Sequence, residues 1–209
     1  LGNEVADGSR SFSAVLSNAG GNATIETASD TGAINDDDVV SNVTIADAQV
    51  DEGGNIVFTV TRSDSSIAQS VDFATSIDAG DTALADDFTA LNGTVNFAVG
   101  ELTQTITVVT TADQAVEQDE TFTVTLTNPT NGAVLQDATA TGTIANEDRS
   151  FAIAADGASV EGNAVTFTVT RTGDTSGTDT VNVTTADGTA IAGTDYTAAS
   201  ETLTSAPGE

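Results

Sequence analysis

The chain has 209 residues, of which 32 are acidic and 4 are basic, so its formal net charge is −28. This charge argues against nucleic-acid phosphate or an anionic membrane as a partner, and it leaves dissolved cations and basic surfaces. Because Cys, Met, Trp and His are all absent, thiol chemistry, disulfides, imidazole catalysis and zinc sites built from His and Cys are excluded.

Targeting and membrane signals are also missing from the sequence. No stretch approaches the roughly 18 apolar residues of a membrane-spanning helix, so direct membrane insertion is not expected. No signal peptide opens the chain, and Leu1 is not a natural start. We therefore expect a segment of a longer protein, with any export signal outside it.

One pattern of residues recurs at intervals of about 110 positions, which is typical of a tandem array of one domain type. It predicts three parts: residues 1–38 as the end of one repeat (the first repeat segment), 39–148 as a complete repeat (the middle repeat), and 149–209 as the beginning of another (the third repeat segment). The matching pairs are Phe12 and Phe122, Leu16 and Leu126, Gly32 and Gly142, Ile34 and Ile144, Asp38 and Asp148, Glu52 and Glu161, Phe58 and Phe167, Arg62 and Arg171, and Asp87 and Asp195.

The elements expected within each repeat are short strands. In residues 56–62, Ile56, Phe58 and Val60 share one face while Thr59 and Thr61 share the other, which predicts a half-buried strand. The same alternation recurs around residues 71–73, 102–108, 122–126 and 165–169, and turn-forming pairs such as Asn-Gly separate the runs. No segment has helical spacing. About seven short strands in a repeat predict an all-β fold, an immunoglobulin-like antiparallel β-sandwich.

Acidic residues gather at the predicted strand ends, several of which should meet at one pole of the sandwich. Carboxylates crowded without Lys or Arg repel one another unless water or a cation screens them. Ca²⁺ fits such a group, because it takes 6 to 8 oxygen ligands and needs neither His nor Cys. A merely solvated acidic surface is the alternative. The recurrence of the acids favours a site, since Asp36-Asp37-Asp38 falls where Asn146-Glu147-Asp148 falls.

The sequence resembles the Calx-beta family, which is found in the calcium-sensing loop of sodium/calcium exchangers and in long extracellular bacterial adhesins. The resemblance rests on Val-Glu-Gly-Asn-Ala-Val-Thr-Phe-Thr-Val-Thr-Arg at 160–171, Asp-Gly-Thr-Ala-Ile-Ala-Gly-Thr-Asp-Tyr at 187–196, Pro-Gly-Glu at 207–209, Glu-Gln-Asp-Glu-Thr-Phe at 117–122, and the acidic triplet that ends each repeat. These segments follow the family's order and cover nearly the whole chain. The resemblance implies tandem Calx-beta sandwiches.

It also implies a set of calcium ligands. In the middle repeat these are Glu52, Asp81, Asp113, the backbone carbonyl of Ala115, Glu117, Glu120, Asn146, Glu147 and Asp148. In the first repeat segment they are Asp7, Asp36, Asp37 and Asp38, with Arg10 in place of the matching Glu, and in the third they are Glu161 and Asp187. Two positions of the middle repeat depart from the family: Ala112 stands where the acidic run would begin, and the Asp before Thr-Ala is displaced to Asp81. We therefore expect fewer ions or weaker binding than in a sensor domain.

Three other patterns give weaker indications of function. Four Asn-X-Thr sequences, at Asn22, Asn42, Asn92 and Asn182, fit the N-glycosylation pattern but arise readily by chance in a Thr-rich chain. Arg62 and Arg171 are expected to pair with nearby carboxylates. Glu117 and Glu120 resemble a glycosidase pair, but such enzymes need an aromatic-lined cleft and Trp is absent, so the chain is not expected to be an enzyme.

These observations predict a calcium-binding structural segment of a secreted or cell-surface protein serving adhesion, a matrix or a fibre, with Ca²⁺ stiffening the junctions between repeats. The expected partners are calcium ions and neighbouring repeats. Two alternatives stay open: a calcium-sensing regulatory domain of a transporter, and a calcium-independent spacer. The incomplete repeats at both ends have two explanations. They allow head-to-tail self-association into a filament, but the simpler explanation is that the sequence is a window cut from a longer chain.

Overall fold

The computed structural model describes residue 6 and residues 8–209, and these residues contain strands and turns but no helix. It follows that no helix in this part of the chain is long and apolar enough to cross a bilayer. The strands are β1 (Arg10–Val15), β2 (Ser29–Ile34), β3 (Asn42–Ile45), β4 (Ala48–Asp51), β5 (Asn55–Arg62), β6 (Gln69–Ser76), β7 (Asn92–Phe97), β8 (Thr103–Val109), β9 (Glu120–Thr127), β10 (Val134–Asp137), β11 (Thr139–Ala145), β12 (Arg149–Ala155), β13 (Phe167–Gly173), β14 (Asp179–Thr184) and β15 (Ser200–Ser205).

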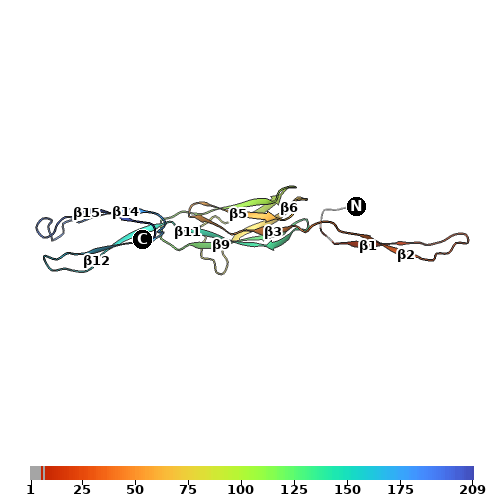
Figure 1. The fold of residues 1–209 in the computed structure, drawn as a ribbon, viewed down its shortest axis with the longest axis horizontal. Helices are drawn as coiled ribbons and strands as arrows, with labels where there is room; N and C mark the ends of the chain where they lie inside the picture. Colours follow the sequence, from red (N-terminus) through yellow and green to blue (C-terminus); the bar gives the residue numbers. More distant parts are fainter. Residues whose placement is uncertain (1–5, 7) are drawn as a thin grey trace.

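Strands β3 to β11 form two sheets packed face to face at the centre of an elongated molecule (Figure 1). One sheet has the strand order β10-β3-β5-β8 and the other has the order β4-β11-β9-β6-β7. This sandwich confirms the predicted all-β class. Most pairs are antiparallel, but β10 pairs with β3 and β11 pairs with β4 in parallel. The parallel pairs arise because the first strand of the sandwich is split, so that β3 lies in one sheet and β4 in the other.

The core of the sandwich lies where the period-two pattern predicts it. Ile56, Phe58 and Val60 on β5 are fully buried, whereas Val57 and Thr59 between them are exposed. Burying such apolar side chains stabilises the fold by roughly 2 kcal/mol each.

Three aromatic rings organise this core. The ring of Phe122 stands edge-on to Phe58 at 5.9 Å and stacks on Phe88 at 4.2 Å between centroids. Gly142 lies beneath them, and a Cβ atom placed there would come within 2.6 Å of Phe122 and 2.8 Å of Phe58. Only glycine therefore fits at this position of β11.

The two ends of the chain are thinner than the centre. β1 and β2 form one antiparallel hairpin at one end of the long axis, while β12–β13 and β14–β15 form two hairpins at the other (Figure 1). Each of these three sheets has only two strands among the described residues.

The expected pairing of Arg62 with carboxylates is wrong. This side chain is buried, and its guanidinium donates to the carbonyl oxygens of Glu101 (2.7 Å), Ile67 (2.6 Å) and Ala98 (2.6 Å). The carbonyls come from the turns that flank β5 and β7, so the side chain holds these turns together at one end of the sandwich. Arg171, its equivalent, follows the expectation in part and lies 3.3 Å from a carboxylate oxygen of Asp179.

Candidate metal centre

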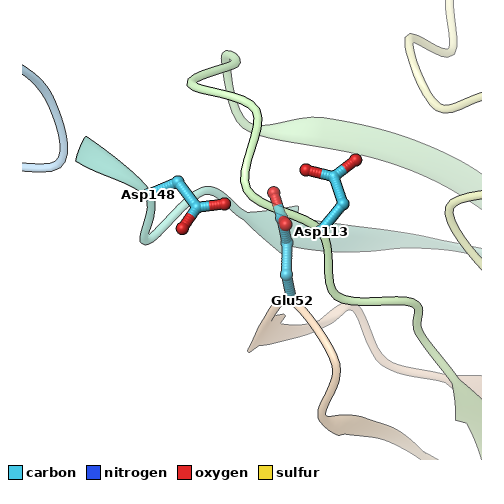
Figure 2. A group of neighbouring side chains, drawn as sticks. All are labelled: Glu52, Asp113 and Asp148. Carbon is cyan, nitrogen blue, oxygen red and sulfur yellow. The ribbon is translucent and has the colours of Figure 1, made fainter. Parts of the chain in front are cut away.

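Three carboxylates from distant parts of the sequence converge at the pole of the sandwich that faces the third repeat segment. Glu52 lies in the turn between β4 and β5, Asp113 in the loop between β8 and β9, and Asp148 at the end of the short connection between β11 and β12. One carboxylate oxygen from each lies within 4.8 Å of the others, and the three side chains point toward one another (Figure 2).

Sheet pairing explains why these residues meet. β4 and β11 run parallel, with Asp51 opposite Ala145, so the residues that follow both strands leave the sheet at the same edge. The backbone N–H of Glu52 donates to the carbonyl of Ala145 (3.2 Å) and to the carboxylate of Glu147 (3.1 Å).

The loop that carries Asp113 is tied to the same turn. Thr110 donates to the carbonyl of Gly54 from its N–H and from its hydroxyl, both at 3.1 Å. Gly53 has φ of 68°, and a Cβ atom there would lie 2.7 Å from the Cβ of Ala112. Position 112, where the family's acidic run would begin, is therefore packed tightly against the β4–β5 turn.

A cavity of about 200 Å³ continues the acidic group toward β9. Its lining includes Glu52 and Asp113 from the converging trio, together with Glu117 and Glu120. Asp86 and Asp87, from the connection between β6 and β7, complete its acidic wall. Neither residue is among the ligands predicted from the sequence, although the recurrence of Asp87-Phe88 as Asp195-Tyr196 was a signal for this position.

The crowding of carboxylates shifts their protonation. Burial, a hydrogen bond with Asp87 and the negative charges of Asp87, Glu117 and Glu52 raise the pKa of Glu120 to about 8. Burial and the charge of Glu147 also raise the pKa of Glu52. Without a cation, this pole thus retains a proton that isolated carboxyl groups would have lost at neutral pH.

The donor set fits a hard divalent cation. Every side chain that converges here offers oxygen, which is the ligand atom that Ca²⁺ takes, and several are carboxylates. One oxygen of Asp148, Oδ2, is buried without a hydrogen-bond partner. Such an atom costs free energy unless something else satisfies it. A cation held by Glu52, Asp113 and Asp148 would do so.

The remaining predicted ligands of the middle repeat lie at different distances from this centre. Asn146 and Glu147 belong to its border, because Asn146 accepts a hydrogen bond from the N–H of Glu117 (3.1 Å) and Glu147 accepts one from Glu52. Ala115 lies in the same loop as Asp113, and its N–H donates to that carboxylate (2.6 Å).

Asp81 is placed differently from the other predicted ligands. Its carboxylate accepts hydrogen bonds from the backbone N–H of Asp78 (2.8 Å) and the hydroxyl of Thr123 (3.0 Å), and it does not line the acidic cavity. Its contacts fix the β6–β7 connection against β9.

The predicted ligands of the end segments do not gather in a comparable group among the described residues. Asp36 accepts from the N–H of Gly8 (2.7 Å). Asp187 accepts from the hydroxyl of Tyr196 (2.7 Å) and from the N–H of Ala192 (2.8 Å). Asp37 and Glu161 are exposed, Asp38 is partly buried, and Asp7 lies outside the described residues.

Comparison with known protein families finds two matches along the chain. The Calx-beta domain family model matches residues 34–148 and again residues 157–209, which together make up more than half of the sequence. The chain belongs to the Calx-beta family. The first match contains the whole sandwich and the acidic pole, which comprises Glu52, Asp113, Asp148 and the acidic residues of the adjoining cavity, Asp86, Asp87, Glu117 and Glu120.

Solved structures show the same fold. The CBD12 from CALX1.2 is 24% identical with a TM-score of 0.50, covering 79% of this chain and 72% of that one. The calcium binding domain CBD12 of CALX1.1 is 24% identical with a TM-score of 0.51, covering 80% of this chain and 71% of that one. A comparison with curated proteins finds no match.

Proposed function

We propose that the middle repeat binds Ca²⁺ at the acidic pole. The convergence of Glu52, Asp113 and Asp148 within 4.8 Å carries this proposal. Glu117, Glu120, Asp86 and Asp87 would add oxygen ligands from the adjoining cavity, which the trio shares through Glu52 and Asp113. Membership of the Calx-beta family and similarity to a calcium binding domain support it.

The proposed role of the ion is structural, at the junction between consecutive repeats. β12 begins at Arg149, directly after the ligand Asp148. The N–H of Asp174, in the β13–β14 turn, donates to the backbone carbonyl of Asp148 (3.0 Å). An ion on Asp148 would therefore fix a residue whose backbone already touches the next repeat, and would stiffen the joint.

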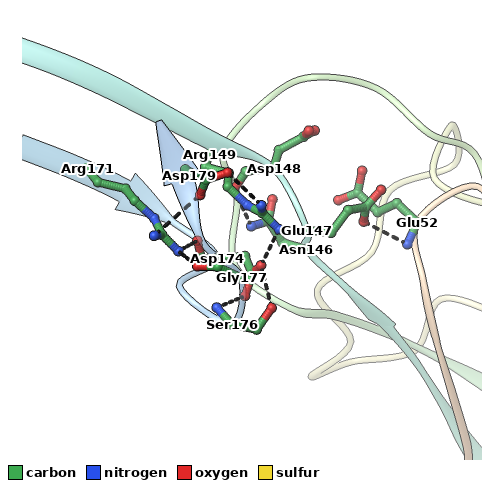
Figure 3. A network of polar contacts seen from close by, with 10 residues as sticks. All are labelled: Glu52, Asn146, Glu147, Asp148, Arg149, Arg171, Asp174, Ser176, Gly177 and Asp179. Carbon is green, nitrogen blue, oxygen red and sulfur yellow. Dashed lines mark hydrogen bonds and ion pairs between the residues drawn. The ribbon is translucent and has the colours of Figure 1, made fainter. Parts of the chain in front are cut away.

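Arg149 holds the other side of this joint. Its guanidinium contacts the carboxylates of Asp174 (2.7 Å) and Asp179 (3.0 Å), as Figure 3 shows. The start of β12 is thereby tied to the turn that touches Asp148. These contacts support a rod of linked domains in which each repeat has the neighbouring repeats as its partners.

We place such a rod in a secreted or cell-surface protein of bacterial type, in adhesion, a matrix or a fibre. The strong acidity of the chain suits solubility in calcium-rich, salty water. The proposed role is not enzymatic, because a carboxylate pair such as Glu117 and Glu120 would need an aromatic-lined sugar cleft to act as a glycosidase, and the sequence has no Trp. A regulatory calcium sensor is the second candidate, favoured by the similarity to the CBD12 structures.

Calorimetric titration of the 209-residue chain with calcium tests the binding. We expect a dissociation constant on the order of 10⁻⁴ to 10⁻³ M, as in extracellular modules. Glu117→Gln combined with Glu120→Gln should abolish the heat, because it removes two carboxylates from the cavity. The control combines Glu26→Gln with Glu201→Gln, which makes the same two side-chain replacements at exposed positions away from the cavity.

The melting temperature of the chain with and without calcium is a second measurement of binding. A ligand in excess of its dissociation constant must stabilise the folded state that binds it. If ten-fold excess calcium produced no heat and no rise in melting temperature, the chain would be a calcium-independent spacer.

A further inference from the structure

Among the described residues, the two sheets of the middle repeat end in the edge strands β10, β8, β4 and β7, and three of these are protected against pairing with another strand. β10 has a register shift and ends at Asp137. β4 is only four residues long and ends at Asp51. β7 contains Gly93, and the hydroxyl of its Thr94 donates to the carboxylate of Asp72 (2.7 Å). Short strands, bulges and charged side chains are common means of keeping sheet edges apart.

The remaining edge strand, β8, has none of these features. It is seven residues long. From residue 102 to residue 112 the chain has no charged residue, no Pro and no Gly, although the whole chain carries a net charge of −28. Thr103, Thr105 and Thr107 are exposed on its outer face. A long, uncharged edge rich in β-branched residues is a template for another strand.

The backbone of β8 faces away from the sandwich at every second residue. The N–H of Arg62 donates to the carbonyl of Leu102 (2.9 Å), so the even-numbered residues of β8 face β5 and the odd-numbered ones face outward. At one end of the edge, the outward carbonyl of Val109 accepts from the N–H of Thr89 (2.9 Å). The outward-facing residues that have no partner strand in the described structure are Thr103, Thr105 and Thr107.

These three residues are complementary to themselves. If β8 pairs antiparallel with the β8 of a second copy about a two-fold axis at Thr105, then Thr105 lies opposite Thr105 and Thr103 lies opposite Thr107. Each pair can exchange both of its backbone hydrogen bonds, because all three residues direct their N–H and C=O groups outward. The edge is therefore matched by a second copy of the same edge.

Charge favours the same arrangement. Two copies that each carry −28 repel each other wherever their carboxylates come close, and like charges directly opposite each other destabilise a strand pair. In the two-fold register Glu101, the acidic residue before β8, falls opposite Val109. Asp113, the first acidic residue after β8, lies beyond the paired stretch. The strands can thus meet without one carboxylate facing another.

We propose that two copies of this chain associate side by side through antiparallel pairing of their β8 strands. The four-stranded sheets of the two middle repeats then join into one continuous sheet. The contact is isologous, so it closes at a dimer and does not propagate. Because the strands of the sandwich run along the long axis of the molecule (Figure 1), the two molecules lie side by side and point in opposite directions. β8 contains none of the proposed calcium ligands, so this inference does not depend on the calcium site.

Sedimentation velocity of the 209-residue chain at rising concentration tests for the dimer. The unaltered chain should shift from monomer to dimer and no further. The shift should be larger at high salt, since screening weakens the repulsion between the acidic chains, and it should persist in chelator. A monomer at every concentration and ionic strength, or a series of larger polymers, would contradict the proposal.

Two substitutions distinguish the edge of the sheet from its outer face. Thr105→Asp places two carboxylates opposite each other at the centre of the pair, and it should weaken association by more than about ten-fold. Thr59→Asp is the matched control, because Thr59 is exposed beside Thr105 but lies on β5, one strand away from the edge. It should associate like the unaltered chain. Melting of the middle repeat reports that both variants are folded, and equal losses of association would show that the edges are not what meets.

Thiol cross-linking tests the register, and the absence of Cys from the chain makes an introduced thiol unique. In the proposed pair the two Cα atoms at position 105 lie about 5.5 Å apart, whereas those at position 103 are separated by four residues along the strands, more than about 13 Å. A short thiol cross-linker should join Thr105→Cys into covalent dimers and leave Thr103→Cys monomeric. Coupling at position 103 that equals or exceeds coupling at position 105, including none at either, would overturn the proposal.

Discussion

At the scale of single residues, Glu120 and its acidic neighbours determine how the acidic pole is protonated. Glu120 opens β9 and shares a hydrogen bond with Asp87, and its raised pKa, about 8, keeps a proton on its carboxyl group at neutral pH. Burial is the largest cause of this pKa shift, and three negative neighbours add to it. A bound divalent cation would replace the proton, because it neutralises the same charges.

The stability of the calcium-free chain should therefore depend on pH. The folded-state pKa of Glu120, about 8, lies above its ordinary value of 4.5. The folded state thus holds the proton more tightly than the unfolded state, and the resulting stabilisation is full below pH 4.5 and is lost as pH rises through about 8. Melting in chelator across this range should show a falling midpoint, and Glu120→Gln should flatten the fall. A midpoint that rises with pH in both proteins would contradict this assignment.

At the scale of elements, Arg62 links the connecting segments at one end of the sandwich through side-chain hydrogen bonds. Its three carbonyl partners belong to the irregular segments between β5 and β6 and between β7 and β8, which share one backbone hydrogen bond, from the N–H of Gly100 to the carbonyl of Ser65 (2.9 Å). The guanidinium also lies over the ring of Phe97, at 5.1 Å from its centroid. A planar group with five donors satisfies this arrangement, and a lysine ammonium does not.

Arg62→Lys should destabilise the middle repeat by about 3 kcal/mol, because a single ammonium cannot replace the hydrogen bonds of the guanidinium to three carbonyl oxygens and leaves a buried charge incompletely paired. Denaturant titration of the middle-repeat transition measures the loss. Arg171→Lys makes the same change at the equivalent position of the third repeat segment, and it should leave this transition unchanged. Equal effects of the two substitutions would show that the buried network around Arg62 is not the cause.

At the scale of the whole molecule, unbalanced charge opposes the compact state. The four basic side chains cannot neutralise 32 acidic ones, and the described Arg149 and Arg171 ion pairs all involve acids of the third repeat segment. The acidic pole of the middle repeat must then be stabilised by protons, by salt or by a bound cation.

In chelator, the middle repeat should stay folded on its apolar core but melt at a lower temperature in low salt than in high salt. Monovalent salt should restore part of the difference, since screening weakens repulsion between the carboxylates. Thermal melts at two ionic strengths measure this directly. Equal midpoints would show that charge repulsion is not the destabilising contribution.

The sequence alone determined the fold class and the core. Alternation of Ile56, Phe58 and Val60 with outward residues is a local property, because side chains of an extended strand point to opposite faces in turn. The sandwich could be predicted from such runs and the turns between them. The spacing of repeated acids likewise indicated which loops carry the acidic pole.

The tertiary structure decided what no local pattern contains. The splitting of the first strand into β3 and β4, and the parallel pairing of β4 with β11, set which strand ends meet and so bring Glu52 beside Asp148. The bridge between Phe88 and Thr110 holds Asp86 and Asp87 at the acidic cavity, and backbone hydrogen bonds from Thr82 and Ala83 to Thr121 of β9 hold Asp81 beside Thr123. Strand alternation fixes the face of a side chain, whereas the meeting of loops depends on the order of strands in two packed sheets.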